Sequence, residues 1–259
     1  MKLKVLMENT AAQENIASEH GLSLYIETGD HRILFDMGQT DAFIRNAEQM
    51  GVDLRSVDLA FLSHGHNDHG GGMQAFLALN DHAPVYVHEL AFGCHGHGDE
   101  VYIGLDGALR DSGRLIFASG DTVVDEYLSL HDCNARECHH PIEAYRLIIR
   151  TENGWQPETF RHEQYLLIRE GGRKILISGC SHKGVVNVAR WLAPDVLIGG
   201  FHLVRVEDER KIEAIADELL SLPIEYYTGH CTGLVQYDQL KKRMGDRLHD
   251  LPAGSEWII

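Results

Sequence analysis

The feature that most constrains this chain is the stretch of residues 57–72, where an apolar run leads directly into a group of polar side chains. Residues 57–62 are mostly apolar and suit a short buried strand. The polar residues that follow are His64, His66, Asp68 and His69. Successive side chains of a strand point to opposite faces, so four side chains can converge only in a loop after the strand. We expect Gly65 and the glycines at 70–72 to give this loop unusual backbone angles.

Three imidazoles and one carboxylate around one point are suitable ligands for a borderline divalent ion such as Zn²⁺ or Fe²⁺. Ligands this close in sequence can also serve two neighbouring ions, one held by a pair of histidines and one by the Asp-His pair. A solvated polar loop is the alternative. It is disfavoured because a hydrophobic strand precedes the polar group and glycines follow it. The sequence therefore predicts one or two divalent ions per chain, with Zn²⁺ preferred over Fe²⁺ or Mn²⁺.

Composition restricts the class of partner. The net charge of −16 argues against non-specific nucleic-acid binding, which needs a basic surface. The five cysteines are odd in number and irregularly spaced, so we expect free thiols or metal ligands instead of a disulfide framework. No apolar run is long enough to span a membrane, and the first residues do not resemble a signal peptide. We expect a cytoplasmic protein that acts on a small molecule; the oligomeric state cannot be inferred.

Alternating strand and helix patterns indicate an α/β fold. We expect strands at 2–7, 21–27, 32–36, 57–62, 84–88, 165–169, 174–178, 195–198, 224–227 and 256–259, and helices at 41–50, 73–79, 185–192, 207–220 and 234–244.

The spacing His-x-His-x-Asp-His at residues 64–69 resembles the signature of the metallo-β-lactamase superfamily. Residues 21–54 together with 62–72 resemble one branch of metal-dependent hydrolases, which includes archaeal dihydropterin–ribofuranosylaminobenzene phosphate synthases. The resemblance implies a four-layer αββα sandwich, a single domain over residues 1–259, and a metal site at the edge of the two sheets. His66 stands where the flavodiiron branch has Glu, which favours a hydrolytic centre over an oxygen-reducing one.

The resemblance is weakest between residues 90 and 160. Two short segments there, 94–99 and 132–140, are rich in Cys, His and acidic residues. Either can hold a second metal, although neither has the paired spacing of a zinc finger. We prefer a variable insertion that forms a lid or a substrate-selecting wall above the site.

A two-metal site needs further ligands, and the second half of the chain offers three candidates. His162 lies at about the position of the superfamily's third motif, although a surface histidine is an equal alternative. Cys180 stands where the superfamily usually has a bridging Asp, so it is either a thiolate ligand or a buried neutral thiol that lines the site. His230 matches the terminal metal-binding histidine. Without the bridging Asp, the two-metal site is expected to be looser or to hold one ion tightly.

Two further histidines complete the candidate set. His182 lies in the Gly-Cys-Ser-His sequence of the resembling branch and is either a ligand or a substrate contact. His202 is assigned to substrate binding or proton transfer. The amides around residues 179–184 and 232–233 open two predicted helices, and free helix N-termini stabilise anions. This favours a substrate that carries phosphate or carboxylate.

The sequence thus predicts a metal-dependent hydrolase of a small anionic substrate that uses a metal-activated water. Asp68 would bind metal and orient the water, while His202 or His182 would protonate the leaving group. One alternative is a transferase similar to the dihydropterin–ribofuranosylaminobenzene phosphate synthases, which would release diphosphate. The other is a metal-dependent ligand-binding protein without turnover.

Overall fold

The computed structural model describes residues 1–259 and contains two large sheets and one small sheet. The first large sheet has the order β18-β1-β2-β3-β4-β5-β8. Its strands are β1 (Lys2–Met7), β2 (Ser23–Glu27), β3 (Arg32–Phe35), β4 (Leu59–Phe61), β5 (Val85–His88), β8 (Leu115–Ala118) and β18 (Glu256–Ile258). Strands β3, β4, β5 and β8 are parallel to one another, so the loops that follow them leave from the same edge.

The second large sheet repeats this arrangement with the order β17-β16-β15-β14-β13-β10-β9. Its strands are β9 (Asp121–Val123), β10 (Leu128–His131), β13 (Tyr165–Glu170), β14 (Arg173–Ile177), β15 (Val196–Ile198), β16 (Glu225–Thr228) and β17 (Leu248–Asp250). Strands β14 to β17 pair in parallel. Their following loops therefore also share one edge.

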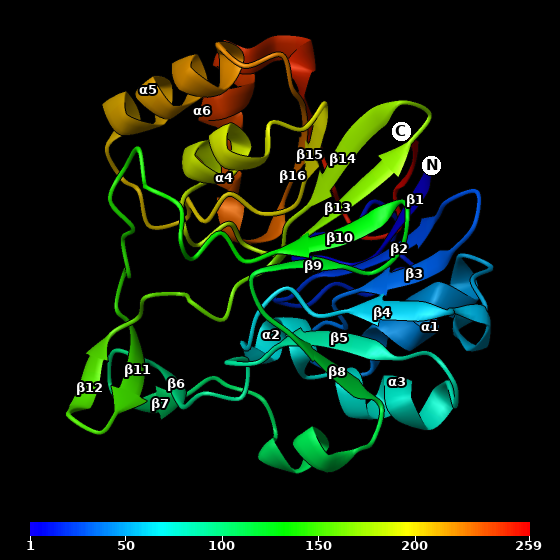
Figure 1. Cartoon of the computed structure of the whole chain (residues 1–259). Coiled ribbons are helices and arrows are strands. Elements are labelled where there is room, and N and C mark those ends of the chain that lie inside the picture. The colour runs from blue at the N-terminus through cyan, green and yellow to red at the C-terminus, as the bar shows by residue number, and fades with distance from the viewer.

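Helices cover the outer faces of both large sheets (Figure 1). The helices are α1 (Ala42–Gln49), α2 (Asn67–Gly70), α3 (Met73–Leu79), α4 (Val185–Leu192), α5 (Glu209–Leu220) and α6 (Leu234–Met244), with 3-10 turns at Leu54–Ser56, Gly107–Asp111, His230–Thr232 and Gly245–Arg247. Helices α1 and α3 lie on the first sheet, and α4, α5 and α6 lie on the second (Figure 1). None of the helices combines the length and apolar composition needed to cross a bilayer.

The core has three apolar clusters, as four layers require. One lies between the two sheets, and the other two lie between each sheet and its helices. The alternation along β2 shows why: Leu24 and Ile26 pack between the sheets, whereas Tyr25 packs on the opposite face with α1. The predicted αββα sandwich is confirmed. The three helices α3, α4 and α6 also have the predicted bounds.

The middle stretch, residues 90–160, is divided by the structure. Strand β8 belongs to the first large sheet, and β9 and β10 belong to the second. The small sheet, order β12-β11-β6-β7, is made of β6 (His95–His97), β7 (Val101–Tyr102), β11 (Leu147–Thr151) and β12 (Gly154–Pro157). It lies apart from the sandwich at one end of the molecule (Figure 1). Strands β6, β7 and β12 have only two to four residues, too few to show an alternation, whereas the apolar run of β11 was a usable signal.

The packing between the sheets gives a direct test of the fold. Phe61 of β4 is fully buried in the inter-sheet cluster and stacks on Tyr86 with ring centroids 5.1 Å apart. We expect Phe61→Ala to lower the free energy of unfolding in urea by about 3–5 kcal/mol, because it removes buried area and leaves a cavity. Phe117→Ala is the matched control in β8 of the same sheet. Phe117 is 41% exposed, so its loss should cost about 1 kcal/mol or less. Equal losses would contradict the layer assignment.

Candidate metal centre

The predicted polar side chains gather where the parallel strands of both sheets end. His64, His66, Asp68 and His69 follow β4, Cys180 and His182 follow β14, His202 follows β15, and His230 follows β16. Segments that are more than a hundred residues apart thus meet at one edge of the sandwich. His69 Nε2, for example, lies 3.0 Å from His230 Nε2.

The glycines of the first loop serve close packing and not unusual backbone angles, so that expectation is wrong. Gly65 and Gly70–Gly72 all lack a positive φ. A Cβ on Gly65 would lie 2.0 Å from the Ala91 carbonyl oxygen, and one on Gly71 would lie 2.2 Å from the Gln39 carbonyl oxygen. Any side chain there would push the loop away from its neighbours. The glycines therefore fix the position of the histidines between them.

Positive φ occurs instead at residues with side chains. These residues are Asp36, Ser181, His202 and His230, with φ between 50° and 58°. A positive φ is energetically unfavourable for residues other than glycine, and such backbone strain is concentrated at functional sites.

Two groups of donors stand side by side. In the first, His64, His66 and His182 have ligand atoms within 4.8 Å of one another, and His64 Nε2 is 3.2 Å from His182 Nε2. In the second, His230 Nε2 lies 3.4 Å from Asp68 Oδ2, and Cys180 Sγ lies 3.2 Å from His69 Nε2. His64, His69 and Cys180 are themselves within the same 4.8 Å limit. The two groups therefore form one continuous donor set.

Buried hydrogen bonds orient the imidazoles so that their Nε2 atoms face the centre of the donor set. Asp36 accepts hydrogen bonds from His69 Nδ1–H and from the Ser63 hydroxyl, both at 2.7 Å. Because the Ser63 hydrogen is used for Asp36, Ser63 Oγ accepts from His64 Nδ1–H at 2.8 Å. His230 Nδ1–H donates to Asn9 Oδ1 at 2.8 Å. In each neutral ring the proton is thus on Nδ1, and Nε2 presents a lone pair.

This donor set fits a divalent cation. Two imidazole lone pairs at 3.0–3.2 Å repel unless a proton or a cation lies between them. Two nitrogens that share a tetrahedral Zn²⁺ at the usual bond length would lie about 3.3 Å apart. In addition, His66 Nε2 and His182 Nδ1 are buried without any hydrogen-bond partner. The fold implies divalent metal binding, and the structure provides a histidine-rich site for it.

The electrostatics also favour a cation. Burial opposes charge on His69, but Asp68 and Asp36 outweigh it and raise the pKa of His69 to about 9. Burial lowers the pKa of His66 to about 3, so this ring is neutral. Burial works against the charge of Asp68, yet His69, His20 and His230 hold the pKa of Asp68 well below its usual range. The site thus combines a neutral imidazole at His66 with carboxylates that favour a positive charge at His69.

His162 lies beside His66, and the ligand atoms of His66, His95, Glu158 and His162 are within 4.8 Å of one another. Its Nδ1 accepts a hydrogen bond from the Gly65 amide at 2.8 Å, between His64 and His66. Its ring lies on that of His95, with centroids 3.8 Å apart, and His95 Nδ1–H donates to Glu158 Oε2 at 2.7 Å. A neutral ring that accepts at Nδ1 carries its proton on Nε2 and has no lone pair there. In this geometry His162 supports the loop that carries two of the other histidines.

The structure adds residues that sequence reasoning did not single out for the site. His20 Nε2 is 3.2 Å from Asp68 Oδ2, and Glu8 accepts a hydrogen bond from the His230 amide. Asp36 is the clearest omission. It follows an apolar strand directly, and a carboxylate in that position was a usable signal. Glu8 follows strand β1 in the same way, whereas His20 gave no signal because it lies in a polar segment without regular spacing.

The amides that were expected to bind a substrate anion are already used. Those of His182 and Lys183 donate to the buried carboxylate of Glu163, at 2.7 and 3.1 Å. The Thr232 amide donates to the Gly229 carbonyl at 3.0 Å. The helix-terminus argument for an anionic substrate therefore fails at these three amides.

A cavity of about 240 Å³ opens on the donor set. Asp68, Cys180, His182 and His202 line it, together with the exposed Arg205. Neither ring nitrogen of His202 has a hydrogen-bond partner, and its ring centroid is 4.1 Å from that of His182. A small molecule in this cavity would contact both the donor set and a free imidazole.

Comparisons with known proteins agree with this geometry. Residues 19–137 match the family model described as the metallo-beta-lactamase superfamily. The crystal structure of Tm1679, titled a metal-dependent hydrolase of the beta-lactamase superfamily, superposes with a TM-score of 0.86 and 27% identity over 100% of this chain and 99% of that one. The chain belongs to the metallo-β-lactamase superfamily.

Within the superfamily, two curated relatives from Methanocaldococcus jannaschii are similar along nearly the whole chain. The uncharacterized protein MJ0448 is 30% identical over 93% of this chain and 94% of its own length. The 7,8-dihydropterin-6-methyl-4-(beta-D-ribofuranosyl)-aminobenzene-5'-phosphate synthase is 28% identical over 98% of this chain and 95% of its own length. The predicted branch is thus confirmed.

The role of Asp36 can be tested without disturbing the backbone. We expect Asp36→Asn to weaken Zn²⁺ binding by about 10–100-fold, since the carboxylate that orients His69 and Ser63 is lost. Asn tolerates the positive φ of this position. Competition with a chromophoric chelator measures the affinity. Asp81→Asn, at a fully exposed carboxylate, is the matched control. Unchanged affinity in Asp36→Asn would show that the hydrogen bonds do not serve metal binding.

Proposed function

We propose that this protein is a metal-dependent hydrolase of a small anionic substrate. The observation that carries the proposal is the approach of imidazole nitrogens to 3.0 and 3.2 Å beside a cavity that His202 lines. In these pairs His64, His69 and His230 use Nδ1–H for other hydrogen bonds. The similarity to Tm1679, titled a metal-dependent hydrolase, supports it.

The proposed ligands fall into two sets. His64, His66 and His182 would hold one ion, and Asp68, His69 and His230 would hold the other. Cys180, which lies 3.2 Å from His69 Nε2, is placed to complete or bridge the two sets. Burial raises the pKa of its thiol well above the ordinary range, and a bound cation would reverse that shift by stabilising the thiolate. His162, first considered as a ligand, is proposed to position Gly65.

When bound, divalent ions supply Lewis-acid polarisation of a substrate oxygen and lower the pKa of a coordinated water. The chain's own residues do the rest. Asp68 faces the cavity and accepts hydrogen bonds, so it can orient the attacking water. His202 has two free ring nitrogens in the same cavity, so it can deliver a proton to the leaving group. Arg205 supplies a positive charge for a phosphate or carboxylate.

Substitution of the first-loop residues tests the proposal. We expect Asp68→Asn and His66→Ala to abolish hydrolysis of phosphoesters and lactones by the Zn²⁺-loaded protein, while the fold survives. Both variants should contain less metal by inductively coupled plasma mass spectrometry, because each loses a donor. Circular dichroism checks the fold, and Asp81→Asn should behave as wild type. Full activity in protein stripped of metal by a chelator would refute the proposal.

A second candidate function rests on the similarity to the dihydropterin synthase over 98% of this chain. In that case the site would hold a diphosphate leaving group while an arylamine attacks. The metal donor set serves both reactions, because in each one negative charge develops on oxygen atoms that a divalent ion can stabilise.

One assay separates the two candidates. If the transferase proposal is right, metal-loaded protein given a dihydropterin diphosphate and a ribofuranosylaminobenzene 5'-phosphate will form the joined product, and mass spectrometry will detect it together with diphosphate. Asp68→Asn should abolish the product. Release of diphosphate without the joined product would favour the hydrolase, and failure to bind the pterin would exclude the transferase.

A further inference from the structure

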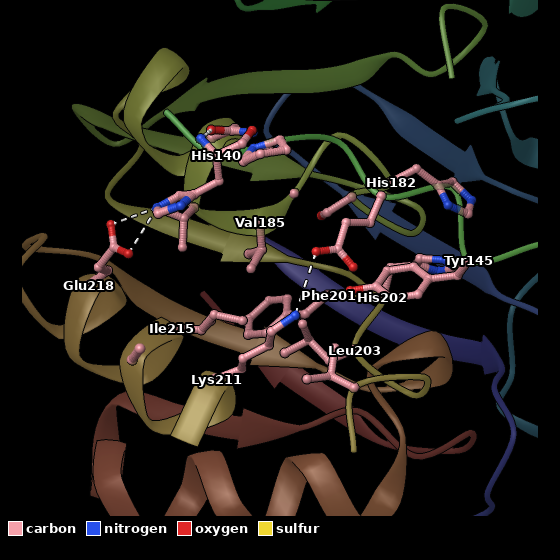
Figure 2. Close-up of a pocket in the computed structure, with 18 residues that line it drawn as sticks. His140, Tyr145, His182, Val185, Phe201, His202, Leu203, Lys211, Ile215 and Glu218 are labelled. Carbon is pink, nitrogen blue, oxygen red and sulfur yellow. Dashed lines mark hydrogen bonds and ion pairs between the residues drawn. The ribbon is translucent and has the colours of Figure 1, made fainter. Parts of the chain in front are cut away.

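A second cavity, of about 280 Å³, lies next to the metal-centre cavity. Its walls come from three parts of the chain: the segment around residues 140–145, the start of α4 with the loop after β15, and one face of α5. Figure 2 shows His182, His202 and Tyr145 at one end, and His140 with Glu218 at the other.

The two cavities share part of their walls. Tyr145, His182 and His202 line both of them. His182 is only 4% exposed, and its Nδ1 has no hydrogen-bond partner. Its ring is fixed by stacking on Phe160, with centroids 4.3 Å apart and planes 3° from parallel. A ligand in the second cavity would therefore lie against His182, which is itself a member of the donor set.

The body of the second cavity is apolar. Val185, Phe201, Leu203 and Ile215 form its middle (Figure 2). Pockets lined in this way bind the apolar part of a ligand, while a few polar groups at one end fix its orientation. Here those polar groups are at the metal-centre end.

The charged side chains along the second cavity lie in pairs, one at the outer end and one beside the apolar middle (Figure 2). His140 Nε2 is 2.9 Å from Glu218 Oε1, and Lys211 Nζ is 3.8 Å from Glu143 Oε1. Both ion pairs join the segment of residues 140–145 to α5, so they also hold the wall in place. Paired charges of this kind offer little net attraction to a charged group, which favours an uncharged occupant.

We propose that the second cavity binds an uncharged ring system of the substrate, of one or two rings, while its phosphate or carboxylate end lies at the metal centre. This inference rests on the proposed function and narrows its substrate class from any small anion to a ring-bearing one. The volume is near the lower end of the range of about 300–1,000 Å³ for ligand pockets, which limits the size of the occupant.

A series of non-hydrolysable phosphonates tests the inference. Methylphosphonate, phenylphosphonate and 1-naphthylphosphonate carry the same head and increasing apolar area. We expect isothermal titration calorimetry on the Zn²⁺-loaded protein to show affinity that rises along the series, with the naphthyl compound at least about tenfold tighter than the methyl one.

Ala214→Trp probes the location of the ring. Ala214 is an exposed residue of α5 that lines the second cavity, so a large side chain should obstruct it without disturbing the core. We expect the affinity ratio between naphthyl and methyl compounds to fall to about threefold or less. Glu213→Trp is the matched control, because Glu213 adjoins it in α5 but does not line the cavity. This control should keep the full ratio.

Three outcomes would overturn the inference, and they differ in what else they exclude. Equal affinity for the three phosphonates, or a ratio that Ala214→Trp leaves intact, would exclude the ring site but leave the proposed function standing. Failure of all three compounds to bind, methylphosphonate included, would overturn the proposed function together with the ring site.

Discussion

The constraint on which the rest of this molecule depends is the confinement of imidazole nitrogens against one another. His69 and His230 come within 3.0 Å, and His64 and His182 within 3.2 Å, in a buried part of the protein. Imidazole lone pairs that face each other at these distances repel unless a proton or a cation lies between them, and burial has removed their hydration. A cation is the natural partner that offsets both costs. The carboxylates of Asp36 and Asp68 independently favour positive charge at this place, since they raise the pKa of His69 to about 9.

The arrangement of the two sheets keeps these imidazoles close together. Parallel strands deliver their loops to one edge of each sheet, and the two sheets face each other so that these edges coincide. Buried carboxylates then fix the loops. Asp36 orients the first loop from β3, and Glu163 holds the amides of the loop that carries His182. Each carboxylate accepts several hydrogen bonds, so each joins segments that the sequence separates widely.

The residues between the edge of the large sheets and the small sheet form the walls around the donor set. His95 and Glu158 belong to or adjoin the small sheet, and they reach the first loop through His162. The segment of residues 140–145 closes the second cavity against α5. Members of a superfamily with a common donor set can thus differ in substrate, because the surrounding walls come from a separate part of the chain.

Much of this could be predicted from the sequence, because the signals are local. Apolar periodicity located the helices α3, α4 and α6 to the residue, and the spacing at His64–His69 indicated the superfamily and its metal chemistry. The local sequence of strand ends also marked His230 and Cys180 as candidates.

Tertiary structure alone decided how these groups are used. That His162 accepts a hydrogen bond from the Gly65 amide depends on a contact between residues 97 apart in sequence, which no spacing reports. The amides near His182 appeared free in the sequence, but Glu163 occupies them after folding. The second cavity requires three distant segments to meet. A sequence specifies which donors are present, whereas only packing determines which lone pairs and hydrogens remain without a partner.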